Sequence, residues 1–196
     1  MQNKAKKPFI TVKEAIIAAI ILWFTAIAFE KVEINQVPTR GVIEAEVRLF
    51  AKQLPVLSVS QIVEKLESGH NKPTLMVIYA SWCGVCKKVL PRIYALKKEG
   101  SLENINLLFI SVDEDKEALS RYVMQHNYTW LFEPYVIEKG GAHNLMNMLA
   151  LRGLDFKLAV PYLAMFDSEG KAITTIRHGG GATKSFLLEN IQKAVN

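Results

Sequence analysis

The chain has 196 residues, a formal net charge of +5 and seven prolines, and half of its residues are hydrophobic. This length suits one ordinary hydrophobic core with an extension and argues against two full domains. Four lysines lie within the first 13 residues, and no later run of Lys and Arg is interleaved with aromatic residues. A nucleic-acid partner is therefore not expected.

An apolar stretch without charges runs from Ala15 to Phe29. As a helix, its fifteen residues would rise about 22 Å, and Thr11, Val12 and a snorkelling Lys13 extend it towards the roughly 30 Å of a hydrocarbon core. Because lysines cluster before the stretch, the positive-inside rule places the N-terminus in the cytoplasm and the rest of the chain outside.

The same stretch also fits a cleavable signal peptide, since residues 26–28 resemble a small-residue cleavage site. We favour a cytoplasmic tip and transmembrane anchor over residues 1–30, because Trp23 and Phe29 suit such a cleavage site poorly. Both interpretations export the remainder of the chain.

A linker and a helix are expected next. Polar residues broken by Pro38 follow the anchor, and apolar residues then keep helical spacing from Val42 to Leu54, ahead of Pro55. We assign residues 31–57 to this linker and amphipathic helix, and residues 58–196 to the folded domain.

Within the folded domain, strand and helix patterns alternate. The expected elements are a helix from a capping box at Ser58 to Gly69, a strand over 73–80, a helix over 86–98, a strand over 105–112, a helix carrying Leu119, Tyr122 and Val123, a strand over 128–132, a helix over 142–151, a hairpin over 159–166 and 172–177, and a helix capped by Thr183. This alternation predicts an α/β fold with a central mixed sheet flanked by helices.

The chain has only two cysteines, Cys83 and Cys86, and both lie in one C-x-x-C motif between a predicted strand and a predicted helix. A structural disulfide framework would need more cysteines, and a structural zinc site would need a second pair or histidines at ligand spacing. The four histidines are single and scattered. We assign redox chemistry to the pair and expect no metal or other cofactor.

The spacing of the two cysteines suits thiol–disulfide exchange. Cys83 would cap the helix, where unpaired N–H groups and the helix dipole favour its thiolate, and Cys86 would lie one turn further along. Cys83 is the predicted nucleophile, which attacks a partner's disulfide, and Cys86 then resolves the mixed disulfide. The reverse steps would oxidise a partner's thiols.

These residues resemble the thioredoxin superfamily. The matches are the segment from Ala80 to Lys87, Pro91 five residues after the second cysteine, and Val160-Pro161 before an apolar strand. The resemblance implies a thioredoxin-like fold in which Pro161 is a cis-proline packed against the dithiol. It also implies that Val160 offers its backbone to a bound peptide and that Trp82 shields the site.

An exported member of this superfamily with an insertion before the cis-proline strand looks most like the TlpA-like group of periplasmic proteins. Residues 110–113 and 166–171 carry this part of the resemblance, and Asp113 and Pro161 are 48 positions apart, which leaves room for the insertion. The resemblance implies a bacterial inner-membrane location with the catalytic domain in the periplasm, protein thiol or disulfide clients, and a membrane electron donor.

Three departures from the family pattern leave the redox direction and the client open. Val77 stands where thioredoxin carries a buried aspartate, and Val89 stands where cytochrome-maturation members carry an acid. Gly84 and Val85, which we count with the residues that support the site, also replace the common Gly-Pro pair. We favour a reductant of specific protein disulfides.

Three alternatives to a reductant stay open. The first is an oxidant or isomerase of exported proteins. The second is a Cu(I)-binding chaperone, since two thiolates suit Cu(I). The third is a redox-inactive interaction module.

Overall fold

The structure is a computed structural model that describes residues 40–68, 71–128, 133–176 and 183–195. Residues Glu44–Asn196 form one compact unit. In the described ranges, no helix is long and apolar enough to cross a membrane. The predicted anchor lies outside these ranges.

A six-stranded mixed sheet has the order β1-β4-β3-β2-β5-β6. The strands are β1 (Val56–Leu57), β2 (Thr74–Tyr79), β3 (Asn106–Ser111), β4 (Pro134–Ile137), β5 (Tyr162–Phe166) and β6 (Ala172–Thr175). The pairs from β1 to β2 are parallel, whereas β2–β5 and β5–β6 are antiparallel. The predicted mixed sheet flanked by helices is confirmed.

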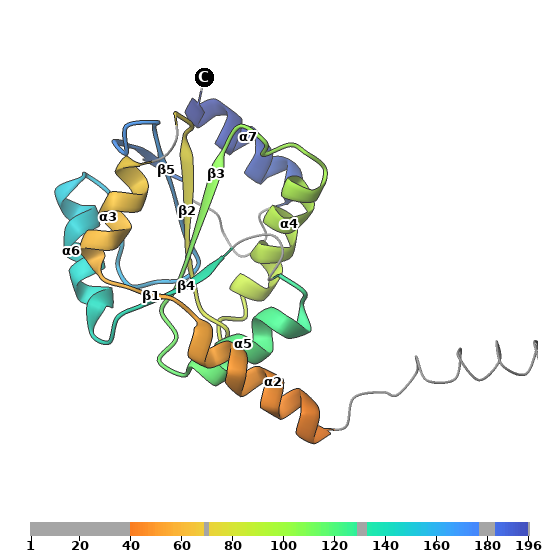
Figure 1. Ribbon diagram of the computed structural model, residues 1–196. Helices are drawn as coiled ribbons and strands as arrows, with labels where there is room; N and C mark the ends of the chain where they lie inside the picture. The colour runs from red at the N-terminus through yellow and green to blue at the C-terminus, as the bar shows by residue number, and fades with distance from the viewer. Residues whose placement is uncertain (1–39, 69–70, 129–132, 177–182, 196) are drawn as a thin grey trace, which may run out of the picture. The chain divides into compact units, whose positions relative to one another are not determined.

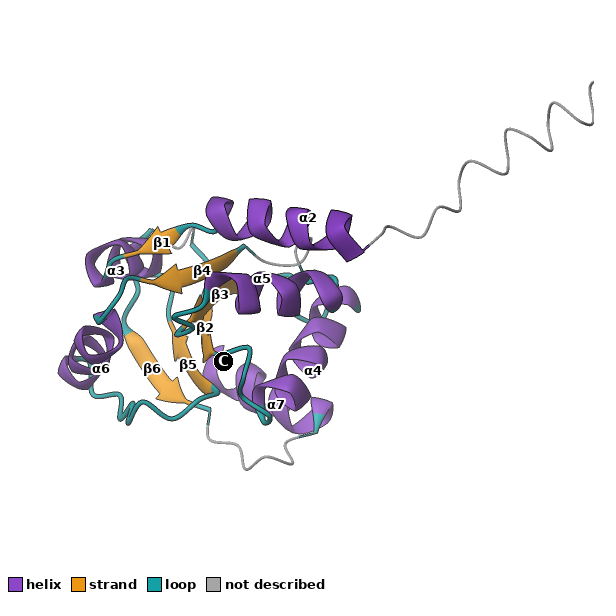
Figure 2. Ribbon diagram, turned by 90° about the horizontal axis from the view of Figure 1, so that it is seen from below, coloured by secondary structure: helices purple, strands orange, loops and turns teal. Residues whose placement is uncertain are grey.

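Helices cover both faces of this sheet (Figures 1 and 2). They are α2 (Arg40–Gln53), α3 (Val59–Glu67), α4 (Cys86–Lys98), α5 (Lys116–Gln125), α6 (Gly141–Leu151) and α7 (Lys184–Val195). Buried residues of α3 and α6 form a core cluster on one face, and those of α4, α5 and α7 form a second cluster on the other.

Strand β2 supplies side chains to both clusters because successive residues of a strand point to opposite faces. Val77 and Tyr79 belong to the cluster with α4, and Met76 and Ile78 to the cluster with α3. All six residues of β2 are buried, which explains its nearly continuous apolar sequence. The strand predicted over 73–80 is confirmed.

Local sequence signals explain where the first helices begin. Ser58 and Gln61 form the predicted capping box at the start of α3. Helix α4 has the predicted bounds. Its buried residues keep the predicted helical spacing, and they include Val89, Leu90, Ile93 and Leu96.

The stretch between Asp113 and Pro161 holds α5, β4 and α6. Tyr128 is outside any strand, and residues 129–132, the rest of the strand predicted there, lie outside the described residues. The observed strand, β4, begins later, at Pro134, and pairs with β1 on one side and β3 on the other.

The compact unit that begins at Glu44 includes most of α2. Val47, Ala51 and Leu54 of this segment are buried, so α2 contributes to the hydrophobic core.

Candidate active site

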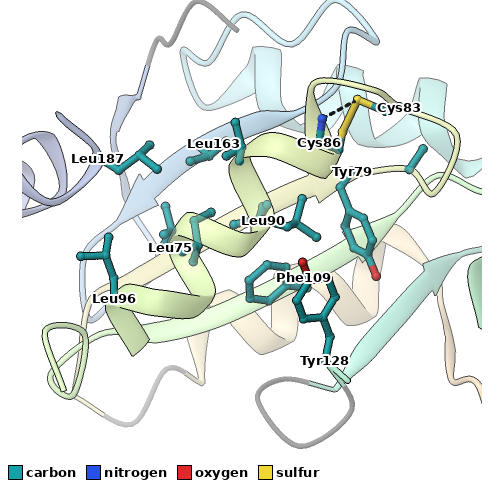
Figure 3. Packing of buried hydrophobic residues seen from close by; sticks show 14 of the residues in the cluster. Leu75, Tyr79, Cys83, Cys86, Leu90, Leu96, Phe109, Tyr128, Leu163 and Leu187 are labelled. Carbon is teal, nitrogen blue, oxygen red and sulfur yellow. Dashed lines mark hydrogen bonds between the residues drawn. A yellow bond between two sulfur atoms is a disulfide. The ribbon is translucent and has the colours of Figure 1, made fainter. Parts of the chain in front are cut away.

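The two cysteines lie where β2 passes into α4. Cys83 follows the end of β2 by four residues, and Cys86 is the first residue of α4. A disulfide joins them, with their Cα atoms 5.2 Å apart. Cys86 is fully buried and Cys83 nearly so. Figure 3 shows the disulfide at the amino-terminal end of α4, above the packed core.

The sulfur of Cys83 occupies the capping position of α4. Val85, the residue before the helix, makes no side-chain cap hydrogen bond. Instead, the backbone N–H of Cys86 donates to Cys83 Sγ at 3.0 Å, and the N–H of Lys87 donates to the carbonyl oxygen of Cys83 at 3.2 Å. When the disulfide is reduced, this arrangement stabilises a thiolate on Cys83, because helix N-terminal N–H groups favour negative charge.

The sheet brings a second loop to the same place. Strand β5 pairs antiparallel with β2, with Ile78 opposite Tyr162, so the residues after β2 lie beside the residues before β5. The carbonyl oxygen of Val160 lies 3.3 Å from Cys83 Sγ. The Val160–Pro161 peptide bond is cis, as the resemblance implied.

Three predicted supporting residues form the exposed part of the site. The side chain of Trp82 is 66% exposed, and that of Val85 is also exposed. A Cβ added to Gly84 would meet no atom within 4 Å. These residues leave room for a second protein to approach Cys83.

The two positions where the resemblance implies acids hold valines that are fully buried. Val77 and Val89 belong to the apolar cluster that also contains Cys86. At both positions, the residue in the cluster around Cys86 is therefore a hydrocarbon side chain.

An acid not anticipated from the sequence lies on the other side of the redox loop. Asp113, just after β3, is 4% exposed. Its carboxylate accepts hydrogen bonds from the Ser81 backbone N–H at 2.8 Å, from Ser81 Oγ at 2.7 Å and from Ser111 Oγ at 2.6 Å. It ties the end of β3 to the turn that precedes Cys83. The available signal was an Asp directly after a buried strand.

Buried tyrosines belong to the same core cluster as the two cysteines. Burial raises the pKa of Tyr79, and the nearby Asp113 carboxylate raises it further. Burial also raises the pKa of Tyr122 and of Tyr128. The neighbouring Tyr128 raises the pKa of Tyr122 further, whereas Tyr122 partly opposes the rise in the pKa of Tyr128. These phenols are therefore neutral at physiological pH.

Within the part of the chain that the structure describes, no group of three or more His, Cys, Asp or Glu side chains could hold a metal ion. Beside Cys83 Sγ lie one backbone donor, the N–H of Cys86, and one backbone acceptor, the carbonyl of Val160. This set suits sulfur chemistry with a polypeptide partner.

Fold and site define an α/β protein with a dithiol–disulfide pair at the start of a helix, facing a cis-proline loop. The sequence matches the thioredoxin-like family over residues 71–172, more than half of the chain. The chain belongs to this family, and with both cysteines of the motif present it is a thiol-disulfide oxidoreductase.

Individual relatives agree with this assignment. Thioredoxin-1 of Drosophila melanogaster is 28% identical over 100 residues, which are 48% of this chain and 92% of that protein. The chloroplastic thioredoxin-like protein HCF164 of Arabidopsis thaliana is 28% identical over 67 residues, which are 34% of this chain but only 25% of that protein.

Solved structures show the same fold. The thioredoxin domain of a thiol-disulfide oxidoreductase from Bacteroides vulgatus has a TM-score of 0.52 and 17% identity, covering 68% of this chain and 84% of that one. A thiol:disulfide interchange protein of the thioredoxin family from Chlorobium tepidum has a TM-score of 0.51 and 16% identity, with the same coverage.

Proposed function

We propose that the chain is a membrane-anchored reductant of specific protein disulfides, with its catalytic domain in the bacterial periplasm. The observation that carries the proposal is the environment of Cys83. Its sulfur accepts the N–H of Cys86 at 3.0 Å and lies 3.3 Å from the carbonyl oxygen of Val160. The N–H of Cys86 can thus stabilise a thiolate on Cys83, and the Val160 backbone beside it can bind a client's peptide chain.

The reaction follows from this geometry. The Cys83 thiolate attacks one sulfur of the client's disulfide and forms a mixed disulfide, and the client's other sulfur leaves as a thiolate. The Cys86 thiolate then attacks Cys83 Sγ and releases the second client thiol. Two electrons pass to the client, and the protein keeps the Cys83–Cys86 disulfide. A membrane dithiol donor restores the reduced state.

The exposed surroundings of the dithiol support a protein client. Trp82 and Val85 are exposed hydrophobic residues that flank Cys83 in the sequence, and exposed apolar surface next to a reactive group favours contact with another protein. The location rests on the apolar stretch from Ala15 to Phe29 and the lysines that precede it.

The reducing direction is supported by the resemblance to the TlpA-like group. Oxidation or isomerisation of exported proteins uses the same steps and is the alternative, because the surroundings of the dithiol allow both directions.

Substitution of the nucleophile tests the chemistry. In the full-length chain in detergent, Cys83→Ser should abolish insulin reduction, because only Cys83 is placed to attack. Cys86→Ser should keep the first attack and accumulate a mixed disulfide, visible on a non-reducing gel. Insulin reduction by Cys83→Ser at the wild-type rate would exclude the mechanism.

A further inference from the structure

Leu158 holds an uncommon backbone conformation three residues before the cis-proline. Its φ of 58° lies in the left-handed region, which disfavours residues other than Gly, Asn and Asp. Among the described residues, the other non-glycine positions with positive φ are Asn71 and Asn127, for which this region is ordinary. A leucine there costs stability that asparagine or glycine would not.

Burial of the side chain does not offset this cost. Leu158 is 38% exposed and belongs to neither core cluster, whereas Leu154 and Phe156 of the same loop are buried. The Phe156 ring packs 4.9 Å from the ring of Tyr162. The loop is therefore anchored in the core by other residues, and Leu158 lies outside that anchor.

Leu158 lies close in the chain to the residues at the reactive sulfur. It precedes Val160 by two residues, so their Cα atoms are at most about 7 Å apart. The Val160 carbonyl oxygen is the group that lies 3.3 Å from Cys83 Sγ. Trp82 and Val85, which lie within two residues of Cys83 in the sequence, are exposed large hydrophobic residues as well. Both loops at the reactive sulfur thus present apolar side chains to solvent.

We propose that Leu158 is a specificity-determining residue that contacts an apolar side chain beside the target cysteine of a protein disulfide. The strained backbone is retained because a polar residue or a glycine would lose that contact. Leu158 therefore favours protein disulfides with apolar flanks over small, polar disulfides. This inference rests on the proposed action on protein disulfides.

The test compares two disulfide substrates and substitutions at two leucines, Leu158 and Leu151. Pre-reduced full-length protein in detergent is mixed with insulin or with oxidised glutathione, and its oxidation is followed in a single turnover. Leu158→Asn should slow the reaction with insulin by roughly tenfold, the size expected for a lost apolar contact, and leave the reaction with glutathione unchanged. Its thermal unfolding midpoint should be equal or higher, since asparagine tolerates the left-handed region.

Leu151→Asn is the matched control, because Leu151 is 89% exposed and carries no proposed role; both of its rates should equal wild type. Leu158→Gly repeats the comparison without a polar side chain. An unchanged rate with insulin, an equal loss with both disulfides, or a lowered unfolding midpoint of Leu158→Asn would each overturn the inference. A wild-type protein that reduces glutathione but not insulin would overturn the proposed function itself.

Discussion

The two sulfur atoms of the site differ in what surrounds them. Cys83 Sγ contacts two backbone polar groups, the N–H of Cys86 and the carbonyl of Val160. Cys86 is fully buried in the apolar cluster that contains Val77 and Val89. The N–H donor favours a charged thiolate on Cys83, whereas apolar surroundings disfavour one on Cys86. This difference supports the proposed nucleophilic role of Cys83.

Asp113 should contribute strongly to stability, because it is a buried carboxylate with three hydrogen bonds. Asp113→Asn keeps the shape of the side chain, but it places an NH₂ group where the carboxylate accepts hydrogen bonds from Ser81 and Ser111. The free energy of unfolding of the oxidised protein should fall by about 2–3 kcal/mol in denaturant titration. Ser120→Ala is the control, since it removes a buried hydroxyl bonded only within α5, to the Lys116 carbonyl. An Asp113→Asn protein as stable as Ser120→Ala would contradict this role.

At the residue scale, the dithiol and the cis-proline could be predicted from the sequence, because a motif marks each of them. The sequence was insufficient for Asp113, whose partner Ser81 is 32 positions away and is brought to it by the pairing of β2 with β3. It was also insufficient for Leu158, because no residue pattern indicates a positive φ at a leucine.

At the scale of elements, buried phenols join α5 to the sheet. Tyr122 of α5 and Tyr79 of β2 belong to one core cluster with Tyr128. Burial raises the pKa of each phenol above the unfolded value of about 10. The folded state therefore holds these protons more tightly, and the resulting stability is complete below about pH 10 and is lost as the pH rises towards the folded values.

Alkaline unfolding measures this contribution. The oxidised protein should unfold at decreasing denaturant concentrations above about pH 10. Tyr122→Phe, which removes one of the phenols, should show a shallower decrease when its midpoint is plotted against pH. Equal slopes for the variant and the wild type would mean that Tyr122 does not couple ionisation to folding.

Long apolar or amphipathic runs made most elements predictable. Strands β2 and β3 and helices α3, α4 and α6 lie within a few residues of their expected bounds. Strands β1 and β4 were not placed, since β1 has only two residues and β4 begins with a proline. The extended form of β1 depends on pairing with β4, and that of β4 on pairing with both β1 and β3, which is a tertiary effect.

At the scale of the whole molecule, the fold gathers chemistry from distant segments. Cys83 and Val160 are 77 positions apart, and they meet because β2 and β5 are antiparallel neighbours at the centre of the sheet. The carboxyl end of β2 and the amino end of β5 share one edge of the sheet. A thioredoxin-like chain therefore needs only the C-x-x-C turn and the cis-proline loop to complete a redox site there.

The reduction potential of the Cys83–Cys86 couple tests the central claim most directly. The full-length chain in detergent would be equilibrated with mixtures of reduced and oxidised glutathione or dithiothreitol, and the dithiol fraction counted after alkylation. A reductant supplied by a membrane donor should have a potential of roughly −250 mV or below. A potential near about −120 mV would make the protein an oxidant of exported proteins and contradict the proposed direction.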